Sequence, residues 1–566
     1  MKKIFIALSV CALALAGCNQ GLLEIPQKGV VDMDNFYKTD EDATMALTAA
    51  YDALATNYLA PLYNDNIIVA LWNYPGDDMY AAGNNKTDNI AQNELNAFRY
   101  PTNNQMITVG YQSFFKAIYG ANLVIDNFKE PDSDVKKNAV AEAKVLRALS
   151  YLQLAIGWGT PPIVDHVLLA TDKPANAESP EAVLDFIVKD IDEALPYLND
   201  RQGPTDKNGA VRATTGLANT IKGKALLWKK DYKGAQAALK KVIESGNYQL
   251  LPTEQIEDNF HVTGDGSPEK IFEINIVYDA SISGYTAHST ANMSWLWNWR
   301  SDCMYIPNGV GTQMHNNGWG ECNPTQKFID VLIANDGMES ARRKAWVKTY
   351  DEVLYEMPYS TDGAEPVMGY SDFKASDKSR GIHRASGLYG HIGYFMWKVN
   401  IQKRDLSSSN ARMQNIRIFR YPEVIFMFAE CAVQTGEDKA MALQLINDIQ
   451  RRAESKTISN ELTMDVIKTE KMIEMWLEGC RYQDLIRWGD TDELKNNGKY
   501  YPNFKDLIFD DKNPTAVHEG VIDESDADWC VKLYPDLGFK EGKHELFPFP
   551  FSETSVNENI KQNPGW

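Results

Sequence analysis

The stretch ATTGLANTIKGKALLWKKDYKGAQAALKKVIESGNY, residues 213–248, reads as two helices joined by a short turn. Apolar or small side chains recur every three or four positions in each half, and residues at that spacing share one face of an α-helix. These residues are Ala218, Ile221, Ala225 and Trp228 in the first half and Tyr232, Ala235, Leu239 and Val242 in the second. Small residues on both faces let two helices approach closely, so the stretch predicts a helical hairpin that turns around Asp231.

A second stretch, EVIFMFAECAVQTGEDKAMALQLINDIQRRA at residues 423–453, repeats this organisation. Its two apolar stripes are Val424, Met427, Phe428 and Cys431, then Ala442, Leu445, Ile446 and Ile449. Gly436 lies between them, where a glycine commonly ends a helix. Both hairpins resemble tetratricopeptide units of about 34 residues, and a generic helical hairpin is the alternative for each. The units are scattered rather than tandem, which argues against a pure solenoid.

Other segments continue the helical periodicity, and long loops separate them. Residues 41–57, 111–129 and 138–156 each carry one apolar face. The stretches 60–110 and 250–410 are instead rich in Gly, Asn, Ser, Tyr and Trp, with a strand-like KIFEINIVY at 270–278. Loops of this length in a compact protein usually serve a function. We therefore predict a mostly α fold, in which tetratricopeptide-like hairpins form a right-handed scaffold with a loop-rich ligand-binding region and a few short strands.

The N-terminus predicts export and lipidation. Lys2 and Lys3 precede IFIALSVCALALA, an apolar run of 13 residues that is too short to span a bilayer and typical of a signal peptide. The run ends in LAGC, residues 15–18, which reads as a bacterial lipoprotein cleavage box. We expect residues 1–17 to be a lipoprotein signal peptide, Cys18 to carry acyl chains that anchor the protein, and residues 18–566 to form one domain. An ordinary signal peptide with an incidental cysteine is the alternative.

Charge and cysteine content narrow the partners and cofactors. The net charge of −20 disfavours nucleic acid, because the phosphate backbone would be repelled. Past Cys18 the chain has an odd number of cysteines and no CxxC spacing, which leaves zinc and redox motifs unsupported. Cys431 and Cys480 lie in helical patterns and read as small buried residues, whereas Cys303 and Cys322 can bridge a loop, and Cys530 remains. We expect no cofactor; a calcium ion in the acidic stretch 510–528 is an alternative to a solvated loop.

Five motifs, taken in order behind the cleavage box, carry a resemblance to a known family. They are LLEIPQKGVVDMDNFYKTDEDATMALTAAYDAL (22–54), AEAKVLRALSYLQLAIGWGTPPIV (141–164), RYPEVIFMFAEC with LINDIQRRA (420–453), EKMIEMWLEGCRYQDLIRWG (470–489) and FPFPFSETSVNENIKQNPGW (547–566). The chain resembles, nearly end to end, the SusD/RagB-like outer-membrane lipoproteins of Bacteroidetes. Gln450, Lys471 and Cys480 depart conservatively from the Arg, Arg and His that are usual in that family.

The resemblance implies a lid-like nutrient-binding protein. It implies a helical body of tetratricopeptide-like units and a loop-built face that binds an oligosaccharide. It also implies lipid anchoring to the outer membrane, cell-surface placement and a SusC-type TonB-dependent transporter as partner. The chain is then not an enzyme, since it captures a ligand and hands it on.

Two of the family-like motifs read as structural. Glu474, Glu478, Arg481, Asp484 and Arg487 are three or four residues apart, which predicts one helix whose charges brace its neighbours rather than catalytic acids. The terminal QNPGW reads as a docked C-terminus.

Aromatic loops supply the chemistry that a sugar needs, namely flat rings for its C–H face and polar groups for its hydroxyl rim. In MSWLWNWRSD, residues 293–302, three tryptophans alternate and so share one face of an extended chain. We expect at least one of them to be open to solvent; the alternative is that all point inward. The candidate ligand-binding residues are Trp295, Trp297, Trp299, Tyr80, Asp77, Asp78, Asn84, Arg300 and Tyr389. Trp72 and Trp397, flanked by apolar residues, favour the core.

Three other functions remain as alternatives. A helical glycoside hydrolase needs two carboxylates across a cleft, but adjacent Asp77 and Asp78 usually point apart, and Asp302 has no visible partner. Nucleophile-elbow, HExxH and P-loop motifs are missing from the sequence. A peptide-binding member of the same import system is the second alternative, and a pure tetratricopeptide scaffold, which leaves the aromatic loops unexplained, is the third.

Overall fold

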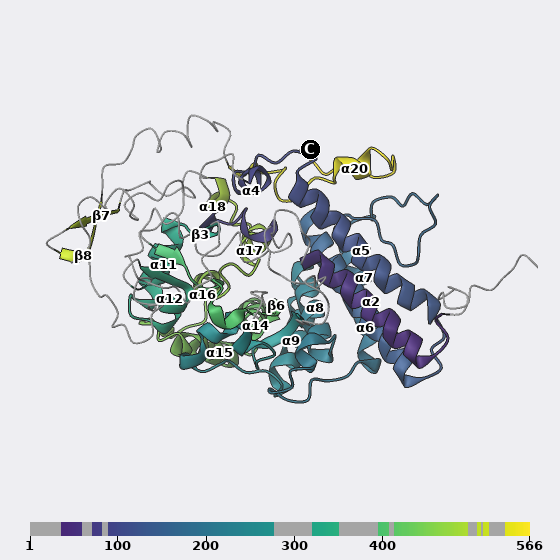
Figure 1. Ribbon diagram of the computed structural model, residues 1–566, viewed down its shortest axis with the longest axis horizontal. Coiled ribbons are helices and arrows are strands. Elements are labelled where there is room, and N and C mark those ends of the chain that lie inside the picture. Colours follow the sequence, from purple (N-terminus) through teal and green to yellow (C-terminus); the bar gives the residue numbers. More distant parts are fainter. Residues whose placement is uncertain are drawn as a thin grey trace, which may run out of the picture.

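The computed structural model describes residues 36–58, 71–81, 89–276, 320–349, 352, 394–406, 413–495, 507–510, 513–519 and 538–566. This part of the chain is mostly helical (Figure 1), which confirms the predicted fold class. The helices are α2 Asp40–Tyr58, α4 Ile90–Asn96, α5 Gln105–Asn127, α6 Asp134–Trp158, α7 Pro180–Ala194, α8 Thr215–Trp228, α9 Tyr232–Glu244, α11 Gln326–Asp336, α12 Ala341–Trp346, α14 Tyr421–Thr435, α15 Lys439–Arg452, α16 Met464–Glu474, α17 Arg481–Trp488, α18 Asp492–Lys495 and α20 Phe551–Thr554.

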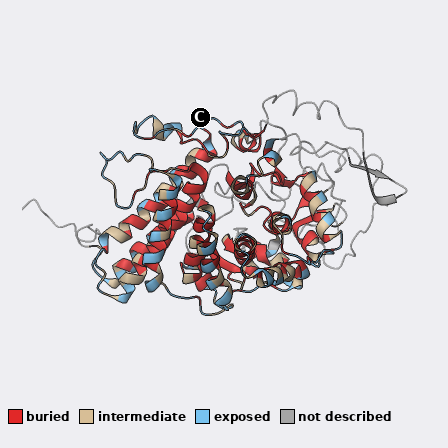
Figure 2. Cartoon of the chain, turned by 180° about the vertical axis from the view of Figure 1, so that it is seen from behind, coloured by how far each residue is buried: buried red, intermediate tan, exposed pale blue. Residues whose placement is uncertain are grey.

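The long helices pack against one another in chain order. Each of α2, α5, α6, α7, α8 and α9 contacts the next, and α9 then packs on α14, which contacts α15 and α16. In Figure 1 the N-terminal helices lie on the right and α11, α12, α15 and α16 on the left. Figure 2 shows the helices buried along their inner faces and exposed along their outer ones. Within the described ranges, no helix is long and apolar enough to cross a bilayer.

The hairpin of residues 213–248 forms as its sequence predicts. Helices α8 and α9 contain the two apolar stripes, and the carboxylate of Asp231 caps α9 by accepting from the backbone N–H of Gly234 at 2.9 Å. Gly223 faces α9 so closely that an added Cβ would lie 2.6 Å from Cγ of Leu239. A glycine is therefore required there by the approach of the two helices rather than by backbone conformation.

Replacing Gly223 with alanine is expected to destabilise the protein by about 1–2 kcal/mol, because overpacking outweighs the gain in helix propensity. The same substitution in a Leu239→Ala background should instead stabilise it by up to about 1 kcal/mol, since the clashing atoms are gone. Urea denaturation of the four proteins of this cycle measures both effects. A stabilising Gly223→Ala in the otherwise native chain would show that the helices are not in contact there.

The second predicted hairpin is also confirmed, as α14 and α15. Gly436 ends α14 in the left-handed conformation, with a φ of 77°. The stripe residues Val424, Met427, Phe428 and Cys431 are buried.

Capping side chains explain where the predicted helix bounds were short. The side chain of Asn104 accepts from the N–H groups of Met106 and Ile107, so α5 begins at Gln105 rather than at residue 111. Ser133 caps α6 in the same way and starts it at Asp134, four residues before the predicted 138.

Short strands connect distant parts of the described chain in four two-stranded antiparallel sheets. The pairs are β1 Met79–Tyr80 with β3 Asn323–Pro324, β2 Lys270–Ile274 with β6 Ile416–Arg420, β4 Val347–Thr349 with β5 Tyr394–Met396, and β7 Leu507–Asp510 with β8 Asn513–Glu519. The predicted strand 270–278 is thus found as β2, which sits opposite β6 with Ile274 paired to Ile416.

The segment 474–487 is not the single helix that its spacing predicts. Helix α16 ends at Glu474 and α17 starts at Arg481, and between them Leu477 and Gly479 adopt left-handed conformations with φ of 62° and 76°. The tight approach of Trp72, whose Cβ would lie 3.3 Å from a Cβ on Gly479, accompanies this turn. The break directs the charges of α16 and α17 to different partners.

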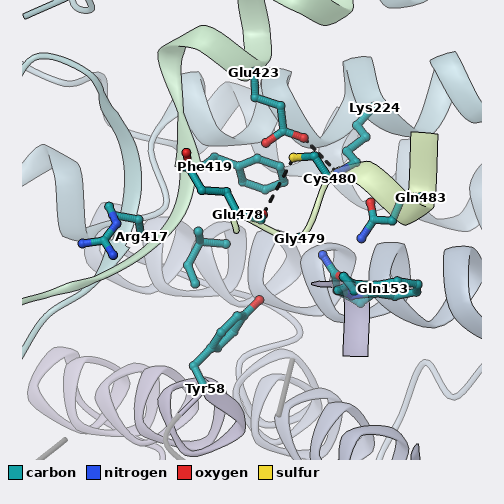
Figure 3. A pocket seen from close by; sticks show the side chains of 12 residues that line it. Tyr58, Gln153, Lys224, Arg417, Phe419, Glu423, Glu478, Gly479, Cys480 and Gln483 are labelled. Atoms are coloured by element: carbon teal, nitrogen blue, oxygen red, sulfur yellow. Dashed lines mark hydrogen bonds and ion pairs between the residues drawn. The ribbon is translucent and has the colours of Figure 1, made fainter. Parts of the chain in front are cut away.

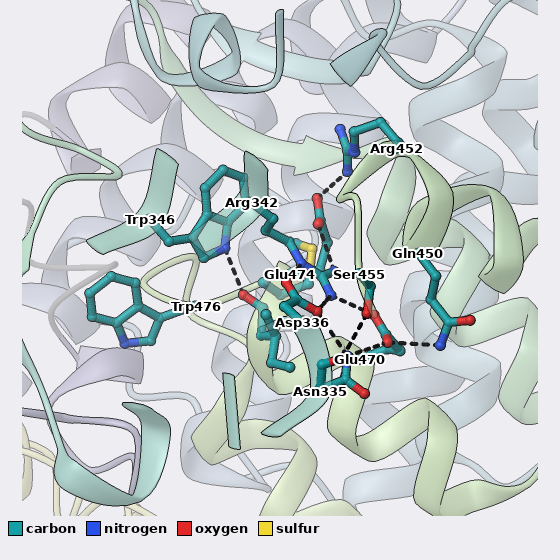
Figure 4. Close-up of polar contacts among 12 residues, drawn as sticks. Asn335, Asp336, Arg342, Trp346, Gln450, Arg452, Ser455, Glu470, Glu474 and Trp476 are labelled. Atoms are coloured by element: carbon teal, nitrogen blue, oxygen red, sulfur yellow. Dashed lines mark hydrogen bonds and ion pairs between the residues drawn. The ribbon is translucent and has the colours of Figure 1, made fainter. Parts of the chain in front are cut away.

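The bracing role predicted for these charges is confirmed. Glu474 is fully buried and accepts hydrogen bonds from Arg452 Nη2 at 2.6 Å and Arg342 Nη1 at 3.2 Å (Figure 4). It also accepts from Arg420 Nη1 at 3.2 Å. These arginines come from α15, β6 and α12. One carboxylate therefore joins three elements that are distant in sequence.

The C-terminus is docked, as predicted. The Asn563 amide donates to the carbonyls of Trp158 and Phe547 at 3.1 and 2.7 Å, and the Trp566 indole donates to the carbonyl of Lys543 at 3.0 Å. These contacts hold the last residues against the end of α6.

Candidate functional site

Most of the predicted ligand-binding residues lie outside the described residues. These are Trp295, Trp297, Trp299, Arg300, Asn84 and Tyr389, and the lipidation site Cys18 lies outside as well. Their proposed roles stay predictions.

The other three candidates are described, and the expectation that they sit on an exposed loop is wrong. Asp77 and Asp78 are each 3% exposed and Tyr80 is fully buried. The segment is buried because β1 pairs with β3. The charge of Asp77 is neutralised by Arg481, whose Nε donates to Oδ1 at 2.6 Å, and by Lys327. The ion pairs of Asp77 therefore help to hold the fold together at this place.

The pKa values of the two adjacent aspartates are shifted in opposite directions. Burial alone would raise the pKa of Asp77, but the charges of Arg481 and Lys327 outweigh it and hold that pKa at about 2. Burial, with the neighbouring charge of Asp77, raises the pKa of Asp78 to about 7.

Trp72 and Trp397 lie in the core, as their apolar neighbours predict. They are 4% and 1% exposed, and the nearby Tyr74 is fully buried too. The Trp72 indole donates to Gln153 Oε1 at 2.8 Å, and that of Trp397 to Glu257 Oε1 at 3.3 Å.

A pocket of about 420 Å³, here called the Glu257 pocket, is lined by residues that include Glu257 and Lys348, both of which contact Trp397. Its volume falls in the range of small-ligand sites. It combines an apolar patch with carboxylate and ammonium groups, contributed by Glu254, Ile256, Glu257, Ala341, Lys344, Ala345, Lys348 and Glu352. The wall comes from the 3₁₀ turns η4 Thr253–Gln255 and η5 Glu257–Phe260, from α12 and from β4.

Several donors hold the Glu257 carboxylate in place. Gln402 Nε2 donates to its Oε1 at 2.7 Å and Arg404 Nη2 at 3.2 Å, and the His261 ring lies 3.4 Å away. Burial would raise the pKa of Glu257, but these contacts, led by His261, lower it to about 2. All of them reach Oε1, so Oε2 keeps its capacity to accept from a ligand.

His261 is fixed between two carboxylates. It is fully buried, its Nδ1 lies 2.8 Å from Asp405 Oδ2, and Glu257 lies on its other side. Burial would lower the pKa of His261, but the two carboxylates outweigh it and raise it. Lys348 is similarly fixed, with its ammonium 4.5 Å from the centre of the Trp397 ring.

The Glu257 pocket can therefore offer fixed acceptors and donors to hydroxyl groups. Sequence reasoning missed it, because His261 and Asp405 are 144 residues apart and no local pattern joins them. The four-residue spacing of Glu257 and His261 was the one local signal.

Three of the five cysteines that follow Cys18 lie within the described residues. Cys431 and Cys480 are buried, as predicted, and so is Cys322. Cys303 and Cys530 lie outside the described residues, so the Cys303–Cys322 bridge stays a prediction. Within the part of the chain that is described, no group of three or more His, Cys, Asp or Glu side chains is arranged to hold a metal. Much of the acidic stretch 510–528 lies beyond that part, and calcium there stays untested.

The chain is similar in sequence to known proteins of one family. A family model described as the SusD family matches residues 268–566, more than half of the chain. SusD-like protein P38 of Formosa agariphila is 23% identical over 517 residues, which cover 86% of this chain and 91% of that protein. The starch-binding protein SusD of Bacteroides thetaiotaomicron is 22% identical over 449 residues, or 75% of this chain and 72% of that protein.

Solved structures match the fold. A laminarin-binding SusD-like protein, 23% identical, has a TM-score of 0.68 over 94% of this chain and 100% of that chain. Surface glycan-binding protein A from Bacteroides thetaiotaomicron, solved in complex with laminarihexaose, is 22% identical and has a TM-score of 0.66 over 93% of this chain and 100% of that chain. The tetratricopeptide-like helical fold predicted from the hairpins is thereby confirmed.

Proposed function

The chain belongs to the SusD family, and from this premise we propose that it is a cell-surface lipoprotein that binds an oligosaccharide. It would deliver the ligand to a SusC-type TonB-dependent transporter in the outer membrane. The observation that carries the proposal is the fold match over 94% of the chain to a laminarin-binding relative. The cleavage box LAGC at 15–18 supports a signal peptide over 1–17 and an acyl anchor on Cys18. The end-to-end match supports one SusD-like domain over 18–566, with its loop-rich insertion at about 250–410.

Two regions are candidates for ligand contact. The first is the aromatic platform of Trp295, Trp297 and Trp299, with Arg300, Asn84 and Tyr389 as polar or aromatic companions. The second is the Glu257 pocket, whose volume suits a sugar unit and whose charged groups suit hydroxyls.

The test of function is a glycan array probed with the soluble form that lacks residues 1–18. We expect selective binding of one class of oligosaccharide, confirmed by titration calorimetry. Peptide binding without glycan binding would contradict the proposal in favour of the peptide-binding alternative. New reducing ends released from any bound glycan would contradict a purely binding role.

The platform makes a sharper prediction. Replacing the correct tryptophan of Trp295, Trp297 and Trp299 by alanine should weaken glycan binding about tenfold or more, taking the stacking energy of about 1–3 kcal/mol per ring seen with nucleic acid bases as the scale. Circular dichroism should show unchanged helix content. The matched comparison is Glu254→Gln, which alters an exposed carboxylate of the Glu257 pocket. If only that variant weakens binding, the ligand lies in the pocket and the platform assignment is wrong.

A further inference from the structure

A small cavity of about 40 Å³ lies where parts of the chain distant in sequence meet (Figure 3). Its walls come from the end of α2, from α6 and α8, from β6 and the start of α14, and from the turn that leads into α17. We call it the junction cavity, because it lies between the N-terminal helices and elements of the C-terminal half. It lies apart from the residues that line the Glu257 pocket.

Among the described residues, no hydrogen-bond partner is found for one polar atom on each of two neutral side chains in its wall. Tyr58 is 2% exposed, and its hydroxyl makes no hydrogen bond to the described residues; burial alone raises its pKa. Figure 3 shows this hydroxyl pointing toward the other labelled side chains of the cavity. Gln483 is 4% exposed, and its Oε1 also has no partner. Buried polar groups without a partner are costly, so native proteins satisfy them with ordered water when the protein offers nothing.

The charges around the cavity favour a neutral occupant. Lys224 Nζ donates to Glu423 Oε1 at 2.9 Å, and Glu478 is held by Arg420 and Lys398. Arg417 also lines the cavity, with its guanidinium 4.8 Å from the Phe260 ring. Two cationic and two carboxylate side chains therefore face one space, so an ion of either sign would meet a like charge.

Size sets the remaining limit. A buried water needs about 10–15 Å³ measured in this way, so 40 Å³ holds about three or four waters and excludes a sugar ring. A water also needs two to four polar partners, and the wall supplies donors and acceptors in Tyr58, Gln483 and Lys224.

We propose that the junction cavity is a binding site for a cluster of about three or four ordered waters, which bridges Tyr58 of α2 to Gln483 of α17. The cluster completes the hydrogen bonding between the two halves of the scaffold. It also hydrates the Lys224–Glu423 ion pair, whose nitrogen has hydrogens beyond the one given to Glu423.

The test is a high-resolution crystal structure of the chain that lacks residues 1–18, determined from crystals grown with bromide as the only halide. We expect density peaks at hydrogen-bond distance, about 2.7–3.2 Å, from Tyr58 Oη and from the Gln483 amide. A cavity without peaks, or Tyr58 and Gln483 turned to bond protein atoms, would overturn the proposal. So would an anomalous signal in the cavity, because that would identify a halide.

Two variants distinguish waters that bind to Tyr58 from waters that would be present regardless of it. Tyr58→Phe should remove the peak at Oη and keep a peak on Gln483. Tyr151→Phe is the matched control, because the Tyr151 hydroxyl already accepts directly from the Val164 N–H at 2.6 Å. That control should leave the cavity peaks unchanged. Retention of every peak in Tyr58→Phe would refute the bridging role, and the native structure alone decides the occupancy should the variant fail to fold.

Discussion

Replacing Glu474 by glutamine is expected to destabilise the protein by about 3–5 kcal/mol. The carboxylate is fully buried and contacts Arg452, Arg420 and Arg342, and these charges, against the opposing effect of burial, lower its pKa to about 2. Glutamine keeps the shape but leaves the arginine charges without their shared counter-charge, and uncompensated buried charges cost about that much. The loss is a large share of the 5–15 kcal/mol by which domains are usually stable.

Urea denaturation of the soluble form at neutral pH measures the loss. Glu339→Gln is the control, because Glu339 forms an exposed pair with Lys344 and its change should leave the midpoint unmoved. The pH dependence has a definite sign. Since folding depresses the pKa of Glu474, its contribution is complete above about 4.5 and is lost as the pH falls toward about 2, so the native–variant gap should shrink in that window. Equal midpoints at pH 7 would show that the cluster does not stabilise the fold.

Local pattern was sufficient to predict the helices, because helical burial repeats every three or four residues along the chain itself. The stripes of α8, α9, α14 and α15 could therefore be read directly. Gly436 could be recognised as a helix end for the same reason. The break between α16 and α17 was missed, since the left-handed Leu477 is a leucine and carries no sequence signal for that conformation, and Gly479 was the one local signal.

The site was harder to predict, because its contacts join residues far apart in sequence. Asp77 looks like an exposed loop acid until Arg481, 404 residues later, is placed against it. His261 and Asp405 are likewise joined only by the fold. The pairing of β1 with β3 buries Tyr80, and a two-residue strand has no period from which such pairing can be read.

Asp78→Asn is expected to stabilise the protein by about 2–4 kcal/mol at pH 8 and by only about 1–2 kcal/mol at pH 5. Folding raises the pKa of Asp78 from 3.8 to about 7, so between these values the folded chain binds a proton that the unfolded chain has released. Stability therefore falls as the pH rises through this window, and above pH 7 the buried charge carries its full cost, at about 1.4 kcal/mol per pKa unit. Asparagine cannot ionise and so avoids that cost.

The preceding residue supplies the matched control, with the opposite expected sign. Asp77→Asn should destabilise the protein at both pH 5 and pH 8 by about 3–5 kcal/mol, because Arg481, whose side chain is 11% exposed, loses its partner. Denaturant midpoints of the native chain and both variants at the two pH values decide the matter. A destabilising Asp78→Asn at pH 8 would mean that Asp78 accepts hydrogen bonds as an ion. Because each charge acts on the other, the double variant should depart from additivity, and the size of that departure measures the repulsion between the two aspartates.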